Sequence, residues 1–473
     1  MAGAGVPFKK LIADKVSDIA LQDALRRATD RFGENRVKML ASLPDAEEAR
    51  DRARAIRRHT IANLDRYLEQ FVGNVERAGG VVHWAADGAE ANSIVVSLAR
   101  ERGVEMVVKG KSMIGEETGL NQALEAAGIV AQETDLAEYV LQLGGEAPSH
   151  IVVPMVHMTR RQVSHLFHEK LGSEESDDVQ RLAAIARAQL RRRFVQAGMG
   201  FSGVNFGVAE TGTLNIVTNE GNGRLCTSLP RCHVALMGIE RLVPTMEDLG
   251  LMLQLLARSA TGQKLTCYTS LMTGPRRAGD ADGPQEVHVV LIDNGRSRIL
   301  ASEYAEMLTC IRCGACLNAC PVYKTISGHG YGAVYPGPMG SVLSPLFAGL
   351  GRYADLPHAS SLCGACREVC PVRIDLPGLL LHLRRDTVAA GHRPWWLKLG
   401  LAGYALGAGN ATVFGLGARL GGMGTGVIAR DGWIEGLPAP LNAWTDSKDF
   451  PRLASKTFQA RWRERQAKQG GGV

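Results

Sequence analysis

Seven of the ten cysteines lie in two short blocks, and their spacing is typical of iron–sulfur ligation. The first block reads Cys310-Ile-Arg-Cys-Gly-Ala-Cys-Leu-Asn-Ala-Cys-Pro321, and the second reads Cys363-Gly-Ala-Cys-Arg-Glu-Val-Cys-Pro371. Two-residue gaps let one tight turn deliver three thiolates to a cubane cluster, while the cysteine before the proline points to the other cluster. Glycine and alanine between the cysteines let the backbone pass close to the inorganic core.

Crossed ligation of this kind predicts which thiolates hold each cluster. The ligands of the first cluster are Cys310, Cys313, Cys316 and Cys370. Those of the second cluster are Cys320, Cys363 and Cys366. The second cluster is one thiolate short, because Ser360 stands where the first block has its first cysteine.

Three explanations for the missing ligand remain open from the sequence. An oxygen from Ser360 or Ser361 completes the site, a cysteine from outside the blocks reaches it, or the site holds a three-iron cluster. The outside cysteines are Cys226, Cys232 and Cys267, and each is more typical of an ordinary buried thiol.

Zinc is the main alternative to iron–sulfur clusters. Two Cys-x-x-Cys pairs alone suit zinc. Three cysteines at two-residue spacing, then a fourth before proline, form a far more specific iron–sulfur pattern. Disulfides are not expected, because clustered cysteines do not resemble the framework of a secreted protein.

Length and composition describe a globular protein of two or three domains: 473 residues, 45% hydrophobic and 22% charged. The net charge of +6 and the 5% aromatic content do not match a nucleic-acid-binding protein. No secretory signal is visible near the start of the sequence. We therefore expect a cytoplasmic protein.

The order of patterns along the chain predicts four regions: N-terminal helices over 1–70, an α/β domain over 71–300, a helical two-cluster domain over 301–391 and a tail over 392–473. Strands alternate with helices in the α/β region, which favours a parallel sheet. The expected strands are 81–84, 105–109, 151–156, 214–218, 233–237 and 287–292. Helices are expected over 162–171 and 178–196.

An apolar, glycine-rich stretch over 395–427 approaches the length of a membrane span. Lys398, Asn410 and Arg419 interrupt it, so packed helices or a peripheral surface are favoured over a true span. The sequence thus allows peripheral contact with a membrane.

Several motifs resemble those of the lactate-utilisation domain. In the first half they are Val108-Lys-Gly-Lys-Ser-Met113, Glu116-Glu-Thr-Gly-Leu-Asn121 and Glu133-Thr-Asp-Leu-Ala-Glu-Tyr139. Further along they are Gly203-Val-Asn-Phe-Gly207, Ala209-Glu-Thr-Gly-Thr-Leu214 and Thr218-Asn-Glu-Gly-Asn-Gly-Arg224. With the cysteine blocks and the stretch from Trp444 to Pro451, the whole chain resembles the lactate-utilisation iron–sulfur protein B family.

The resemblance implies a sheet like those of sugar-phosphate isomerases and CoA transferases, followed by a helical ferredoxin-like domain with two 4Fe-4S clusters. It also implies a role as an electron-transfer subunit in the oxidation of L-lactate to pyruvate. Two partner proteins are implied, one of which carries cysteine-rich heterodisulfide-reductase-type repeats. The resemblance assigns no catalytic residue.

The α/β region offers candidates for an anion site of its own. Lys109 and Lys111 lie where a strand ends and a helix begins, so lysine charge and helix amides can converge on a carboxylate. With Glu210 and Arg224 they form the main candidate set. Secondary candidates from neighbouring loops are Thr211, Asn219, Glu220, His157 and Arg160. Solvated loop charge is the competing interpretation.

No flavin or nicotinamide motif is recognisable, so the sequence assigns the hydride step to a partner or to a cofactor bound in an unfamiliar way. Two alternatives to L-lactate oxidation stay open. One is an iron–sulfur subunit for another 2-hydroxy acid, such as glycolate. The other is a redox sensor whose α/β domain binds a small anion.

Overall fold

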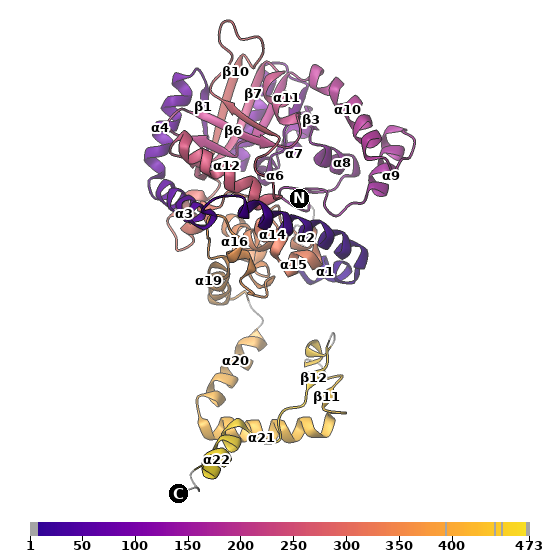
Figure 1. Cartoon of the computed structure of the whole chain (residues 1–473), viewed down its shortest axis with the longest axis vertical. Helices are drawn as coiled ribbons and strands as arrows, with labels where there is room; N and C mark the ends of the chain where they lie inside the picture. The colour runs from indigo at the N-terminus through magenta and orange to yellow at the C-terminus, as the bar shows by residue number, and fades with distance from the viewer. Residues whose placement is uncertain (1–7, 393–394, 439–440, 446–447, 470–473) are drawn as a thin grey trace. The chain divides into compact units, whose positions relative to one another are not determined.

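The computed structural model describes residues 8–392, 395–438, 441–445 and 448–469 (Figure 1). The middle of the Trp444–Pro451 stretch therefore lies outside the described residues. The chain divides into two compact units, Met1–Ala390 and Gly391–Val473. The first unit contains the N-terminal helices, the sheet and both cysteine blocks.

The first unit is built on a six-stranded sheet in which every neighbouring pair of strands is parallel. In spatial order its strands are β1 (Val81–Ala85), β10 (Glu286–Ile292), β7 (Cys232–Gly238), β4 (Met199–Gly203), β2 (Met106–Lys109) and β3 (Val130–Glu133). The expectation of an α/β fold with a parallel sheet is confirmed.

Helices surround this sheet. Those N-terminal to it are α1 (Phe8–Ser17), α2 (Ile19–Ala41), α3 (Ala46–Ala62) and α4 (Leu64–Arg77). Those between or after its strands are α5 (Gly88–Glu101), α6 (Met113–Thr118), α7 (Leu120–Ala126), α8 (Leu136–Gly144), α9 (Arg160–Leu171), α10 (Val179–Gln196), α11 (Asn222–Ser228), α12 (Met246–Ala260) and α13 (Arg296–Leu300).

Both faces of the sheet are apolar, which explains why its central strands read as continuous hydrophobic runs. Successive residues of a strand point to opposite faces. In β7, Val234 and Leu236 pack with residues of α5 and α7, whereas Ala235 and Met237 pack with residues of α4. The sheet is therefore covered on both sides, and only the ends of its strands are free to build a site.

A second, four-stranded sheet has the order β8 (Leu242–Val243), β5 (Phe206–Val208), β6 (Thr213–Thr218) and β9 (Tyr268–Met272). It is mixed, because β5 pairs with β8 in parallel and with β6 antiparallel. The expected strand over 214–218 therefore exists, but it belongs to this sheet and not to the parallel one.

The expected strand over 151–156 is wrong, because this segment forms turns. Pro154 lacks the backbone N–H that a sheet ladder needs. Its carbonyl instead accepts a hydrogen bond from Ser149 N at 3.0 Å. His150 Nδ1 also accepts hydrogen bonds from the backbone amides of Val152 and Val153, which fixes the turn.

The cysteine blocks lie in a helical region against α2 and α3. Its helices are α14 (Ala315–Ala319), α15 (Pro321–Ile326), α16 (Gly337–Ala348), α17 (Leu350–Tyr353), α18 (Ala365–Glu368) and α19 (Leu376–Ala389). Arg50 of α3 donates to Cys370 O at 2.9 Å, and the fully buried Arg57 donates to Leu308 O at 3.0 Å and Thr309 O at 3.2 Å. The N-terminal helices thus hold the chain on both sides of the cysteines.

The second unit contains α20 (Trp395–Ala408), α21 (Ala411–Ile428), the short pair β11 (Trp433–Ile434) and β12 (Phe450–Pro451), and α22 (Phe458–Gln469). No single described helix is long and apolar enough to cross a membrane, and α20 and α21 meet that test only as a pair bent by 112°. α20 buries none of its described side chains, and Leu406 is 81% exposed. The two helices form an exposed apolar surface and not a packed core.

Candidate iron–sulfur centre and adjoining pocket

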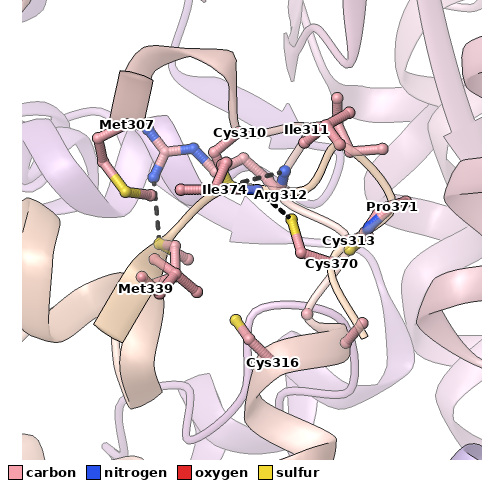
Figure 2. A pocket seen from close by; sticks show the side chains of 14 residues that line it. Met307, Cys310, Ile311, Arg312, Cys313, Cys316, Met339, Cys370, Pro371 and Ile374 are labelled. Atoms are coloured by element: carbon pink, nitrogen blue, oxygen red, sulfur yellow. Dashed lines mark hydrogen bonds between the residues drawn. The ribbon is translucent and has the colours of Figure 1, made fainter. Parts of the chain in front are cut away.

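Four cysteines from both blocks surround one small cavity (Figure 2). They are Cys310, Cys313, Cys316 and Cys370, the set expected from crossed ligation. Met307 and Met339 close the cavity with apolar side chains. The cavity therefore offers four sulfur ligands in a largely dry surrounding.

The backbone around these sulfurs fits an iron–sulfur cluster. Gly314 has a φ of 76°, a left-handed conformation that turns the chain tightly between two cysteines. Arg312 N lies 3.5 Å from Cys310 Sγ, and Ile374 N lies 3.4 Å from Cys370 Sγ. Amides that donate to sulfur stabilise the thiolate form that a metal needs.

The thiols themselves also favour a metal. Burial, and then Cys370, raise the pKa of Cys313 above the ordinary range of a thiol. Burial, and then Cys320, raise the pKa of Cys366 to about 12. Buried thiols that crowd together stay protonated unless a cation binds them, and metal binding deprotonates a coordinating thiol. Cys370 lines the same cavity as the first block, and Cys320 lies close enough to Cys366 for its charge to act there.

A buried hydroxyl, that of Tyr331, lies beside Cys320 of the second site. Tyr331 is 1% exposed, and its Oη has no hydrogen-bond partner among the described residues. Cys320 lies close enough to raise the pKa of the Tyr331 phenol, after the larger effect of burial. The sulfur of Cys320, or an anionic sulfur of the cluster that it binds, would accept a hydrogen bond from this hydroxyl.

A larger pocket of about 350 Å³ adjoins the first cysteine block. Residues that follow β2, β4 and β7 line one side, at the carboxyl edge of the parallel sheet. Arg312 and Cys313 line the other side. Ligands of open parallel sheets bind at this edge. The pocket therefore lies at the usual ligand position and is also lined by Cys313, a cysteine of the first cavity.

The lining of the pocket includes four cationic side chains, those of Lys111, Arg241, Arg296 and Arg312. Glu240 is 2% exposed and receives Arg296 Nε at 2.6 Å and Arg312 Nη2 at 3.4 Å. Arg241 has no ion-pair partner among the residues that the structure describes, and its one hydrogen bond goes to Cys310 O at 3.3 Å. Burial, and then the charge of Arg312, lower the pKa of Arg241. A carboxylate would relieve this repulsion.

Three of the residues expected from the sequence do line this pocket: Lys111, Asn219 and Glu220. Lys111 Nζ donates to Val152 O and lies 3.8 Å from Glu138 Oε1. Burial, and then the charge of Asp135, raise the pKa of Glu220 to about 7. Glu220 is therefore partly protonated near neutral pH.

The other candidates lie elsewhere. Lys109 is 1% exposed and is paired with Glu133 Oε1 at 2.6 Å. Glu210 accepts a hydrogen bond from Met246 N at 3.0 Å, at the start of α12. Arg224 lines a different surface pocket. Thr211 bonds within its own turn and Arg160 donates to a carbonyl near α10, so the candidate set does not converge.

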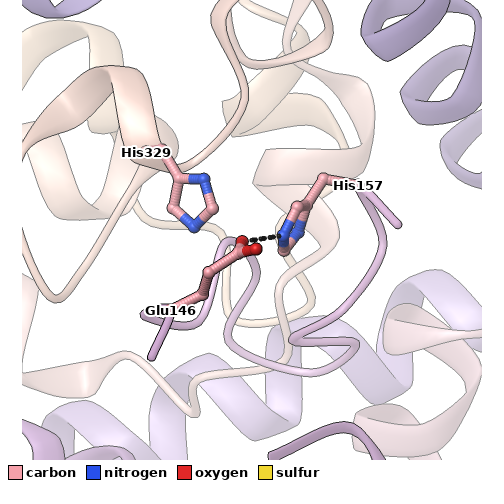
Figure 3. Close-up of side chains that lie close together, drawn as sticks. All are labelled: Glu146, His157 and His329. Atoms are coloured by element: carbon pink, nitrogen blue, oxygen red, sulfur yellow. Dashed lines mark hydrogen bonds and ion pairs between the residues drawn. The ribbon is translucent and has the colours of Figure 1, made fainter. Parts of the chain in front are cut away.

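His157 lies in a separate cluster (Figure 3). Its Nε2 is 2.9 Å from Glu146 Oε2, and its Nδ1 is 2.7 Å from Ser149 Oγ. The ring of His329 lies 4.6 Å away in an edge-to-face arrangement, and His329 Nε2 donates to Ala147 O at 2.7 Å. His157 thus connects the loop after α8 to the segment that follows the first cysteine block.

The residues that sequence reasoning missed are Glu240, Arg241 and Arg312. Glu240 and Arg241 follow directly after β7, and the carboxyl end of a parallel strand is a signal for ligand contact. Arg312 stands between two ligand cysteines, where the motif itself requires no charge. The sequence therefore contains two signals for these residues: a position after a strand for Glu240 and Arg241, and a charge inside the cysteine motif for Arg312.

Comparison with known proteins identifies two domain families in the chain. Residues 68–292 match the family model of the LUD domain, and residues 306–374 match that of the 4Fe-4S dicluster domain. Lactate utilization protein B of Macrococcus caseolyticus (strain JCSC5402) is 45% identical over 467 residues, 98% of each chain. Its counterpart in Geobacillus thermodenitrificans (strain NG80-2) is 45% identical over 97% of each chain.

Two further matches concern a third relative and a solved structure. The "Uncharacterized electron transport protein YkgF" of Escherichia coli (strain K12) is 42% identical over 98% of this chain and 97% of its own. The crystal structure of a DUF162 family protein from Deinococcus radiodurans matches 48% of this chain and 98% of its own, at 12% identity and a TM-score of 0.27.

Proposed function

Because the chain belongs to the lactate utilization protein B family, we propose that it is the iron–sulfur electron-transfer component of a multi-protein system that oxidises L-lactate to pyruvate. The observation that carries the proposal is the pocket between the carboxyl edge of the sheet and the first cysteine block. Cys313, a predicted ligand of the first cluster, lines this cavity together with the cationic side chains of Lys111, Arg241 and Arg312.

The chemistry divides naturally between this chain and its partners. Oxidation of a 2-hydroxy acid to a 2-oxo acid releases two electrons and two protons. A cubane cluster accepts electrons singly, so two clusters suit the onward relay better than the removal of a hydride. The role that we propose for this chain is therefore to receive electrons and pass them on.

The charges of the pocket suit the carboxylate that lactate and pyruvate share. Among the residues that the structure describes, the Arg241 side chain hydrogen-bonds only to Cys310 O, and Arg312 of the same pocket has its guanidinium 4.5 Å from the ring centroid of Tyr335. Two guanidinium groups of this kind bind a carboxylate through charge-assisted hydrogen bonds. Lys111 adds a further positive charge to the pocket wall.

We propose two partner proteins, of which one carries cysteine-rich heterodisulfide-reductase-type repeats. The test is an anaerobic reconstitution that follows the visible absorbance and EPR signals of the clusters in this chain. Reduction by L-lactate only in the presence of both partners is the expected result. Reduction by glycolate in preference to L-lactate would indicate another 2-hydroxy acid, and no substrate-linked reduction would favour a redox sensor.

A further inference from the structure

The two cysteine blocks share one backbone conformation, although their sequences differ at the first ligand position. In the first block, Arg312 has a φ of 58° and Gly314 a φ of 76°. In the second block, the matching residues Leu362 and Gly364 have φ values of 56° and 86°. A left-handed conformation is unfavourable for arginine and leucine. Because both blocks adopt it at the same position, the two loops have the same shape, which indicates that they serve the same purpose.

This loop places the Ser360 hydroxyl where the first block has a thiol. In the first block, the amide of Arg312 donates to Cys310 Sγ at 3.5 Å. In the second block, the amide of Leu362 donates to Ser360 Oγ at 3.1 Å. Both bonds run from a residue to the side chain two positions before it. The side-chain oxygen of Ser360 thus takes the position of the sulfur of Cys310.

The segment around Ser360 is held firmly by α19. Arg384 Nη2 donates to Ser360 O at 2.8 Å, and Arg384 Nε donates to Pro357 O at 2.8 Å. Ser360 is half-buried, whereas Ser361 is exposed. Of the two serines, only Ser360 has both the amide contact and the shielded position of a ligand.

The cysteines outside the blocks are occupied in other parts of the first unit. Cys226 is buried in the core around α9 and α10, with its Sγ 3.3 Å from Thr134 Oγ1. Cys232 is buried in β7 of the parallel sheet. Cys267 is exposed in the loop before β9, where its amide donates to Asn219. None of the three is held in contact with the second block by a described hydrogen bond.

We propose that Ser360 is the fourth protein ligand of the second cluster, so that this site holds four irons bound by Cys320, Cys363, Cys366 and one serine oxygen. When the Fe–O bond forms, the hydroxyl loses its proton to solvent and binds as an alkoxide. The amide of Leu362 remains as a donor to that oxygen. The ligand set of the second cluster does not depend on the identity of the substrate.

The test compares Ser360→Ala, Ser360→Cys and the control Ser361→Ala in full-length protein purified without oxygen. Iron content, EPR of the oxidised protein and Mössbauer spectra of iron-57-enriched protein are the readouts. For Ser360→Ala we expect one iron fewer per chain and a three-iron EPR signal. Ser361→Ala should match the wild type in both.

Ser360→Cys keeps the proposal testable even if the alanine variant fails to fold. We expect it to retain full iron content and to lose a distinct iron site seen in the wild-type Mössbauer spectrum, because a thiolate replaces the harder alkoxide. Its second cluster should also have a higher reduction potential. Unchanged spectra in Ser360→Ala and Ser360→Cys, a three-iron cluster in the wild type, or iron loss in Ser361→Ala instead would each overturn the proposal.

Discussion

Arg296 Nε donates to Glu240 Oε2 at 2.6 Å, and the two side chains are 1% and 2% exposed. Glu240 also lies 3.4 Å from Arg312 Nη2, inside the first cysteine block. One buried carboxylate therefore connects the end of β7, the start of α13 and the loop that presents the first cluster ligands. Burial alone would raise the pKa of Glu240, but these arginines lower it to about 2.

The first prediction is that Glu240→Gln destabilises the protein by about 3–5 kcal/mol, because it removes the carboxylate that pairs with Arg312 and one of the two carboxylates that pair with the buried Arg296, which keeps Glu117 at 2.9 Å. Chemical denaturation of the protein with its clusters, followed by circular dichroism, measures the effect. Glu247→Gln is the control, since Glu247 is an exposed acid of α12 that lies 3.8 Å from Arg52. Equal stability of the two variants would show that the buried pair contributes nothing.

The second prediction concerns Arg241, the pocket arginine without an ion-pair partner among the described residues. Arg241→Gln should weaken pyruvate binding about ten- to hundredfold, because a charge-assisted hydrogen bond to the carboxylate is lost. Isothermal titration calorimetry measures this. Arg224→Gln is the matched control, since Arg224 lines a different pocket. The assignment of the pocket fails if both variants bind pyruvate as the wild type does.

The third prediction is a pH dependence that arises from Glu220. Burial and Asp135 raise its pKa from 4.5 to about 7. In this range the folded state holds more protons than the unfolded state, so this group's contribution to stability falls as pH rises from 4.5 through 7. Ionisation also adds negative charge to the pocket. Pyruvate should therefore bind several-fold more weakly at about pH 8 than at about pH 6.

Glu220→Gln should remove most of this pH dependence and keep the tighter binding at the higher pH. Calorimetric titrations of both proteins in the same two buffers make the comparison. A Glu220→Gln variant that still loses affinity between the two pH values would assign the effect to another group.

The fourth prediction concerns Tyr331, whose buried hydroxyl lies near Cys320. Hydrogen bonds to cluster sulfur raise the reduction potential because they stabilise the more negative, reduced state. Tyr331→Phe should therefore lower the potential of the second cluster and leave the first unchanged. A potentiometric titration monitored by EPR distinguishes the two clusters. Equal potentials in variant and wild type would mean that the hydroxyl donates no hydrogen bond to the cluster.

The strands that sequence patterns predicted best are those buried in the middle of the sheet. β7 and β10 read as continuous apolar runs, which is what burial on two faces requires. β4 was missed because it contains glycine. At Gly200, a side-chain carbon would lie only 1.8 Å from Cys226 O. Gly200 thus makes β4 hard to recognise in the sequence, and the same glycine allows α11 to pack closely against β4.

The part of the candidate site that could be predicted is the cysteine set, because its short spacings are visible in the sequence itself. Cys310 and Cys370 come together around one cavity, as their motifs indicated. The charged candidates could not be predicted in the same way. The position of a charged residue in a loop does not show which neighbouring side chain will form an ion pair with it. The position of Lys109 at the end of a strand predicted an anion-binding residue. In the structure, however, Lys109 is paired with Glu133 on the adjacent strand. The position of Arg241 after β7 is a signal in the sequence, but only the three-dimensional structure shows that it has no ion-pair partner among the described residues.

The most direct test of the proposed function is an electron balance in an anaerobic mixture of this protein, its two proposed partners and L-lactate. Pyruvate and reduced clusters are measured in the same sample, by chemical assay and EPR. The account predicts that the clusters of this chain become reduced as pyruvate forms, and that omission of the chain stops electron delivery. Pyruvate that accumulates while these clusters stay oxidised, or that forms equally fast without the chain, would contradict it.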